Sequence, residues 1–264
     1  MAARRILVAE DNEANALLIE RQLAKLGYEA ALVADGQEAL SALERERYAL
    51  VLMDCQMPGL DGFETTRAIR EAERGTDRRT PVVAVTASAT ERDRDACFEA
   101  GMDDCVTKPL LLEELAAAVE RWTSGGHHPG PHPSSVCATP TTEGSNQEPV
   151  LDGSVLARLR DEIGDDGVSR FVATFLAELP GRLLAMREAV VGDDADALRA
   201  AAHALRSPSA AVGAQALAAA CRRLEELGAA GDLNGARAPS AALEEIGRET
   251  ARLLAPEADE ADLS

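Results

Sequence analysis

The chain has 264 residues, 46% of them hydrophobic, which is enough to bury the cores of one large domain or two ordinary ones. Its formal net charge of -19 at pH 7 excludes a non-specific nucleic-acid surface, because phosphate backbones are held by clustered Lys and Arg. The five cysteines form neither a disulfide framework nor a metal-type pair, and no apolar run is long enough to span a bilayer. We therefore expect a cytoplasmic chain without a membrane segment.

Short apolar runs alternate with longer amphipathic segments over the first half of the chain. The runs typical of strands are residues 5–9, 29–33, 48–53, 81–85 and 105–107. The segments with helical spacing are residues 12–26, 37–45, a stretch after Gly62, 91–100 and 111–122. Five strand–helix repeats predict a doubly wound α/β domain with a five-stranded parallel sheet, whose ligands bind outside the carboxyl ends of the strands.

The composition changes sharply at residues 123–149, which read "TSGGHHPGPHPSSVCATPTTEGSNQEP". This stretch is rich in Pro, Gly, Ser and Thr and has almost no large apolar residue. It cannot bury enough surface to offset the entropy of ordering it, so it is predicted to be a flexible linker with incidental histidines.

Apolar residues recur at three- and four-residue steps after the linker, and no convincing strand is found there. Glycine breaks at Gly164, Gly192 and Gly231 punctuate this pattern, each followed by an acidic cap. The second half is therefore predicted to be an all-α antiparallel bundle of four or five helices. The predicted organisation is a first domain at residues 1–122, a linker at 123–149, a helical bundle at 150–255 and an acidic tail at 256–264.

Polar residues stand just past the carboxyl ends of the predicted strands. The acidic ones are Glu10, Asp11 and Asp54, and the others are Thr86 and Lys108. Because these ends meet at one edge of a parallel sheet, we expect three carboxylates to face one lysine.

Close carboxylates repel one another unless a cation neutralises them, and hard oxygen ligands of this charge suit Mg²⁺. The Asp54 carboxylate can also attack a phosphoryl group and form an acyl phosphate. Mg²⁺ and Lys108 would balance the charge on the transferred oxygens, and the Thr86 hydroxyl would contact the new phosphate.

Several ordered segments of the first half resemble a response-regulator receiver domain over residues 4–122. They are "LVAEDNEANALLIERQLAKLGYEAALVADGQEAL", "LVLMDCQMPGLDGFETTRAIR", "VVAVTASA" and "GMDDCVTKPL". The resemblance implies a flavodoxin-like fold in which Asp54 accepts the phosphoryl group while Thr86 and Lys108 contact it. It further implies a Mg²⁺ site made by Glu10, Asp11, Asp54 and the Gln56 backbone carbonyl, and a cis bond between Lys108 and Pro109.

One position departs from the receiver family. Three residues before the lysine that family usually has Tyr or Phe as a rotamer switch, and this chain has Cys105. A cysteine fills space but cannot swing a ring, so we expect signalling without the usual aromatic switch and a role as phosphate carrier.

The second half resembles a histidine-containing phosphotransfer (HPt) domain through "DADALRAAAHALRSPSAAVGAQALAAACRRLEELG". The resemblance implies that His203 is a phosphoacceptor. An exposed imidazole is a good nucleophile at neutral pH, and Arg206, three residues on, shares its helix face and can bind phosphoryl oxygens. Ser207 stands where the family usually has glycine, and the interior Pro208 predicts a kink or early end of the helix.

We therefore predict a two-module phosphorelay protein. A partner phosphohistidine would pass its phosphoryl group to Asp54, and His203 would be a second phosphoacceptor and donor. The partners would be a sensor histidine kinase, a downstream response regulator or both. The chemistry would be self-phosphorylation and dephosphorylation rather than metabolic turnover. The alternative is a phospho-gated adaptor whose helical domain binds receivers without transferring phosphate.

Overall fold

The computed structural model describes residues 5–86, 91–123 and 149–259. The chain divides into two compact units, Met1–Thr141 and Thr142–Ser264, which are described separately. The predicted linker lies outside the described residues from 124 to 148, as do residues 260–264 of the predicted tail. Within the described part, no helix combines the length and apolar character that crossing a membrane requires.

The first unit is built on a five-stranded parallel sheet with the strand order β2-β1-β3-β4-β5. The strands are β1 (Arg5–Ala9), β2 (Glu29–Val33), β3 (Leu50–Asp54), β4 (Val82–Thr86) and β5 (Asp104–Thr107). The three central strands are almost completely buried, whereas β2 and β5 are partly exposed edges. Continuous apolar runs suit strands that are covered on both faces, so the predicted α/β sheet is confirmed.

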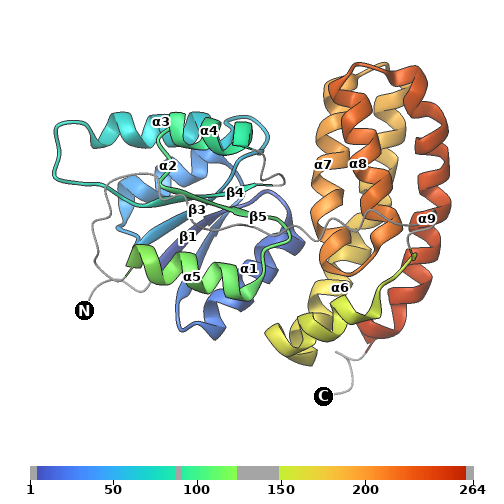
Figure 1. The fold of residues 1–264 in the computed structure, drawn as a ribbon, viewed down its shortest axis with the longest axis horizontal. Helices are drawn as coiled ribbons and strands as arrows, with labels where there is room; N and C mark the ends of the chain where they lie inside the picture. Colours follow the sequence, from blue (N-terminus) through green and yellow to red (C-terminus); the bar gives the residue numbers. More distant parts are fainter. Residues whose placement is uncertain (1–4, 87–90, 124–148, 260–264) are drawn as a thin grey trace. The chain divides into compact units, whose positions relative to one another are not determined.

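Helices cover both faces of this sheet (Figure 1). They are α1 (Glu13–Lys25), α2 (Gly36–Arg45), α3 (Gly62–Glu73), α4 (Glu91–Glu99) and α5 (Leu112–Thr123). Helices α1 and α5 lie on one face and α2, α3 and α4 on the other.

Alternate residues of the strands point to these two faces and make two cores. On β1, Leu7 joins the core under α2 and α3, and Val8 joins the core under α1 and α5. Both side chains are at most 1% exposed. Packing on both faces holds the strand ends rigidly, which positions the groups at the carboxyl edge.

The second unit is a bundle of helices. They are α6 (Gly153–Val191), α7 (Ala195–Ala211), α8 (Gln215–Ala229) and α9 (Leu233–Asp259). Helix α6 packs on α7 and α9, and α8 packs on the same two helices, so the four surround one core. Short turns join them, so successive helices run antiparallel, as predicted.

The three predicted glycine breaks all fall at interruptions of the helices. Gly164 has φ 77° and kinks α6, Gly192 caps the end of α6, and Gly231 lies between α8 and α9. The last helix continues to Asp259, so the predicted tail begins as helix. An ion pair between Arg160 of α6 and Glu257 holds this end against the bundle.

Proline 208 does not end its helix. The sequence predicts a kink or an early end just beyond His203, but α7 runs on to Ala211, so the early end is wrong. Pro208 lies in the last turn of α7, and its ring is buried. Its carbonyl still accepts the N–H of Val212, and the Ser209 hydroxyl donates to the Leu205 carbonyl. Burial and these bonds offset the cost of an interior proline.

Candidate functional site

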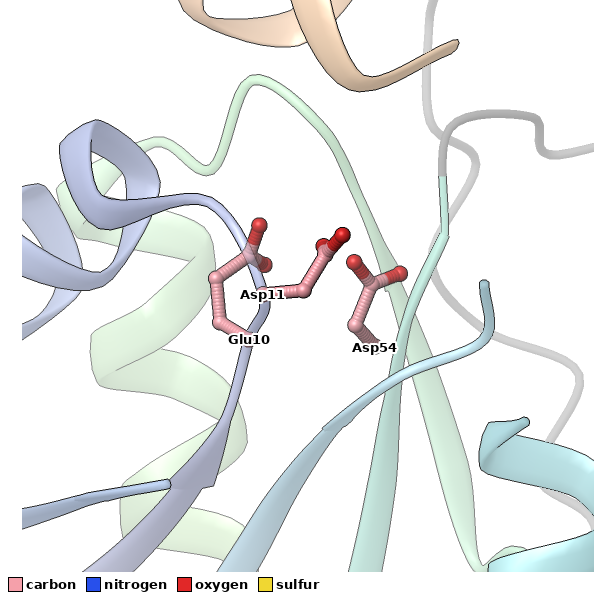
Figure 2. A group of neighbouring side chains, drawn as sticks. All are labelled: Glu10, Asp11 and Asp54. Carbon is pink, nitrogen blue, oxygen red and sulfur yellow. The ribbon is translucent and has the colours of Figure 1, made fainter. Parts of the chain in front are cut away.

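Three carboxylates meet at the carboxyl edge of the sheet (Figure 2). Glu10 and Asp11 directly follow β1, and Asp54 is the last residue of β3, the parallel neighbour of β1. One oxygen of each lies within 4.8 Å of the other two. Glu10 and Asp54 are buried, and Asp11, whose side chain extends toward Asp54, is half-buried. The fold therefore brings the three predicted acids together.

Lys108 follows β5 and reaches the same acids. Its Nζ lies 2.6 Å from Asp54 Oδ2 and 2.7 Å from Glu10 Oε2, and its side chain is only 5% exposed. The backbone N–H of Lys108 donates to the Thr86 carbonyl at 2.7 Å, which ties the loop to the end of β4. The peptide bond from Lys108 to Pro109 is cis, as the resemblance implied.

Burial and neighbouring charge shift the pKa values of this cluster. Burial raises the pKa of Glu10 to about 7, helped by the Asp54 charge and opposed by Lys108. Burial acts to lower the pKa of Lys108, but Glu10 and Asp54 outweigh it and raise that pKa. The lysine thus stays charged beside three carboxyl groups, and one positive charge cannot balance them. The excess negative charge favours a divalent cation.

The Asp54 carboxylate is held through both oxygens. Oδ1 accepts the Gln56 backbone N–H at 3.1 Å, and Oδ2 accepts a hydrogen bond from Lys108. Thr86 is the last residue of the neighbouring strand β4, next to Val85, which pairs with Asp54 in the sheet. The five predicted polar groups of this edge thus come from the ends of four strands.

Gly62 lets α3 begin directly against Asp54. A Cβ on Gly62 would lie 2.1 Å from the Asp54 carbonyl oxygen, and the Gly62 N–H donates to the Cys55 carbonyl. We expect a Gly62→Ala variant to lose about 1–3 kcal/mol of unfolding free energy, because the backbone must shift. Urea denaturation of the first unit measures this loss. Gly59→Ala, where nothing lies within 4 Å of the added Cβ but φ is 77°, measures the cost of backbone strain without a clash. Equal stability of Gly62→Ala and wild type contradicts the prediction.

Cys105 lies on the edge strand β5 in the position where the receiver family usually has an aromatic residue. Its side chain packs against the buried core under α2 and α3. It fills space there, in agreement with the sequence interpretation.

The second group of polar side chains joins α7 to α8. His203 on α7 places its Nδ1 2.9 Å from Oε1 of Glu225 on α8. Arg206, one turn after His203, places Nη1 2.8 Å from the other oxygen of the same carboxylate. The side chain of His203 is 11% exposed. The expectation of an exposed imidazole is therefore wrong, because Glu225 covers one edge of the ring.

The protonation of Glu225 decides which His203 nitrogen is free. Burial acts to raise the pKa of Glu225, but the His203 hydrogen bond and the Arg206 charge outweigh it and lower that pKa. An ionised carboxylate only accepts hydrogen bonds, so Nδ1 must carry the proton. The lone pair of the neutral imidazole then lies on Nε2, which becomes the nucleophilic atom.

The lowered pKa of Glu225 also predicts a pH dependence of stability. A carboxyl group whose pKa is lower in the folded state stabilises the fold above its unfolded pKa, about 4.3, and loses this contribution as pH falls through the folded value. We expect wild type to be more stable than Glu225→Gln near neutral pH, and the difference to shrink below about pH 4. Urea denaturation of the second unit from pH 7 to 3 measures it. A constant difference would contradict the prediction.

Sequence reasoning missed two residues that hold the predicted groups. In the sequence Glu225 is one residue of the segment that resembles the HPt family, and its contact with His203 requires α7 and α8 to pack together. Asn15 on α1 donates its side-chain N–H to Glu10 Oε1 at 2.8 Å. The sequence feature that could have indicated this contact is the position of Asn15 in the first turn of α1, about one helical turn after Glu10 and Asp11.

Fold and sites define a class of protein. A parallel sheet in the order 2-1-3-4-5 with acids and a lysine at its carboxyl edge is a receiver-type domain, and a bundle that presents a held histidine is of the phosphotransfer type. Family models agree: residues 6–120 match the response regulator receiver domain, and residues 170–256 match the Hpt domain. The chain thus carries a receiver domain and an Hpt domain of two-component signalling.

The curated relatives are much longer proteins. The sensor protein GacS of Pseudomonas syringae pv. syringae is 36% identical over 201 residues, which cover 75% of this chain and 20% of the relative. The hybrid signal transduction protein dokA of Dictyostelium discoideum is 42% identical over 117 residues, 44% of this chain and 7% of the relative. The chain therefore spans a fifth or less of these proteins.

Solved structures match the first unit. One is the receiver domain of the sensor histidine kinase PA1611 from Pseudomonas aeruginosa PAO1, which was crystallised with a magnesium ion in its active site cleft. It is 45% identical, and the match covers 47% of this chain and 99% of that domain, with a TM-score of 0.43. The complex of Saccharomyces cerevisiae Ypd1 with the Ssk1 receiver domain matches at 30% identity, 46% and 88% coverage and a TM-score of 0.43.

Proposed function

We propose that the chain is a phosphorelay protein in which Asp54 accepts a phosphoryl group from a partner phosphohistidine and His203 is a second phosphoacceptor and donor. The observation that carries this proposal is the presence in one chain of an acid-and-lysine cluster and of a histidine held by a carboxylate. The partners are a sensor histidine kinase, a downstream response regulator or both. A cytoplasmic location of the chain is part of this proposal.

The three carboxylates fit a Mg²⁺ ion, since hard oxygen ligands with excess negative charge are what this ion takes. Glu10, Asp11 and Asp54 would hold it together with the Gln56 backbone carbonyl. When bound, Mg²⁺ supplies positive charge that offsets the carboxylates and the phosphoryl oxygens.

The first transfer uses groups at the ends of the strands. An Asp54 oxygen attacks the phosphorus atom of the partner's phosphohistidine, an oxygen–phosphorus bond forms, and the phosphorus–nitrogen bond breaks. The imidazole leaves with the bonding electron pair and takes up a proton. Lys108, already 2.6 Å from Asp54, stabilises the charge on the transferred oxygens. The Thr86 hydroxyl donates to one of these oxygens.

The second transfer uses the held imidazole. His203 Nε2 attacks the phosphorus atom of an aspartyl phosphate, and the aspartate carboxylate leaves. The Nδ1–H group of His203 donates a hydrogen bond to Glu225. The Glu225 carboxylate stabilises the positive charge that develops on the ring. Arg206 is close enough to turn from Glu225 to the phosphoryl oxygens. The intact helix through Pro208 and this histidine–carboxylate pair favour transfer over the adaptor alternative.

The test is phosphorylation of the full chain by acetyl phosphate with Mg²⁺. We expect a base-labile adduct on Asp54 by peptide mapping, and loss of this adduct to background when EDTA removes divalent cations. Added Mg²⁺ in excess of EDTA should restore it. Labelling that is equally fast in EDTA would contradict the metal requirement, and absence of any Asp54 adduct would contradict the proposed function.

A further inference from the structure

Two cysteines of the first unit are in contact next to Asp54, the proposed phosphoacceptor. Cys55 follows Asp54 in the chain, and its Sγ lies 3.8 Å from the Sγ of Cys97 on α4. Cys55 is 4% exposed and Cys97 is fully buried. Figure 1 shows α4 on the same face of the sheet as α3, above the strands. The phosphoryl-transfer chemistry described above does not use either thiol.

The two thiols lie in the packed interior of the domain. The Cys55 backbone is fixed between neighbours, since its N–H donates to the Val85 carbonyl and its carbonyl accepts the Gly62 N–H. Both side chains belong to one core cluster under α2, α3 and α4. Their 3.8 Å separation exceeds the disulfide length of about 2.05 Å, so bond formation requires the side chains to turn and α4 to shift.

We propose that Cys55 and Cys97 form a dithiol site that hydrogen peroxide converts to a disulfide. The Cys97 sulfur attacks one peroxide oxygen, the oxygen–oxygen bond breaks, and water leaves after protonation, which gives a sulfenic acid. The Cys55 sulfur then attacks Cys97, the sulfur–oxygen bond breaks, and a second water leaves. Two thiols and one peroxide thus give one disulfide and two waters, with sulfur oxidised and peroxide oxygen reduced.

Two features assign the attacking sulfur and the oxidant. Either sulfur can donate the hydrogen bond between the two thiols. With Cys55 as the donor, this bond lowers the pKa of the Cys97 thiol against the effect of burial, and we take Cys97 as the first sulfur to react. Burial of both thiols excludes bulky oxidants such as glutathione disulfide and selects a small one.

The disulfide would also act on Asp54, and this part rests on the proposed function. A disulfide would pull on Cys55, which directly follows Asp54 and precedes Gln56, the residue whose backbone N–H donates to Asp54 Oδ1. Misplacing a reacting group by about 1 Å costs roughly a hundredfold in rate. The rate at which the oxidised chain accepts phosphoryl groups should therefore fall by about tenfold or more.

Peptide mapping tests the site without any phosphorylation. The folded full chain in a Cys137→Ser background, which removes the cysteine outside the described residues, is treated with peroxide, alkylated and digested without reductant. We expect a peptide that links Cys55 to Cys97 and that dithiothreitol separates. Free alkylated Cys55 and Cys97 after this treatment, or sulfinic acid on either one without a link, would overturn the proposal.

Variants of cysteines in the same core provide the controls. Cys97→Ser and Cys97→Ala should both abolish the linked peptide, and circular dichroism shows whether each retains its fold. Cys105→Ser, from β5 beside the same core, should still form the link. A link from Cys55 to Cys105 in wild type would contradict the assignment.

Acetyl phosphate labelling of the oxidised and reduced chains then measures the effect on Asp54. We expect slower labelling after oxidation, recovery after dithiothreitol, and no peroxide effect in Cys97→Ser. Equal rates with the disulfide formed would overturn the coupling. If the reduced chain takes no label, the proposed function fails while the mapping result still decides the disulfide.

Discussion

The variant Asp54→Asn is expected to show no phosphoryl adduct on either unit when the purified chain is incubated with acetyl phosphate and Mg²⁺. Asparagine nearly matches the size of aspartate, but its neutral amide is a poor nucleophile and forms no acyl phosphate. Lys108 keeps an ionic partner in Glu10, so the site should remain folded. Under the proposed function, small acyl phosphates react at Asp54 and His203 is filled through Asp54, so both adducts should fall to background.

Intact mass and peptide mapping distinguish the two adducts, since an acyl phosphate is base-labile and phosphohistidine is acid-labile. The matched control is His203→Gln, which should keep the Asp54 adduct and lose the acid-labile one. An acid-labile adduct on His203 in Asp54→Asn would show that His203 is filled without the receiver domain. A base-labile adduct at full level in Asp54→Asn would place the phosphoacceptor elsewhere.

The variant Glu225→Gln is expected to slow transfer to His203 by about a hundredfold, as loss of a positioned proton acceptor does in other sites. Glutamine has the shape of glutamate but can also donate, so it no longer fixes the proton on Nδ1. It also removes the negative charge that stabilises the developing imidazolium. Asp54 lies in the other unit, so its labelling by acetyl phosphate should be unchanged.

Quenched-flow labelling of His203 from the phosphorylated receiver domain measures this rate. Nitrogen chemical shifts of the His203 ring report the tautomer, a readout that a purely structural role of Glu225 would leave unchanged. Glu226→Gln, an exposed neighbour on the same helix that pairs with Arg223, is the control and should behave as wild type. Wild-type transfer rates and an unchanged tautomer in Glu225→Gln would refute the assigned role.

Much of the first unit could be predicted from residue order. The buried strands are continuous apolar runs, and the residues that follow them are polar, so the sequence predicts which residues lie at the carboxyl edge of the sheet. Glu10, Asp11, Asp54 and Lys108 lie together as predicted, because parallel strands bring their ends to one edge. The glycine breaks of the second unit were equally readable, since glycine alone adopts the positive φ found at Gly164 and Gly231 without strain.

Contacts between elements could not be read this way. The sequence treats His203 and Arg206 as neighbours on one helix, but the carboxylate between them comes from α8, 22 residues away from His203. The effect of Pro208 was also misjudged, because local propensity counts the lost backbone bond and not the burial of the ring.

The sequence by itself therefore determined the two fold classes and the strand ends, because these depend on periodicity and on residue type. Its resemblance to the receiver and HPt families pointed to the two phosphoacceptor candidates. Only the tertiary structure decided which groups hold them: Glu225 at His203, Asn15 at Glu10, and Cys97 against Cys55 beside Asp54. Such pairs depend on how helices pack on each other or on the sheet. That packing is set by the fit of many side chains across distant segments, which no local pattern contains.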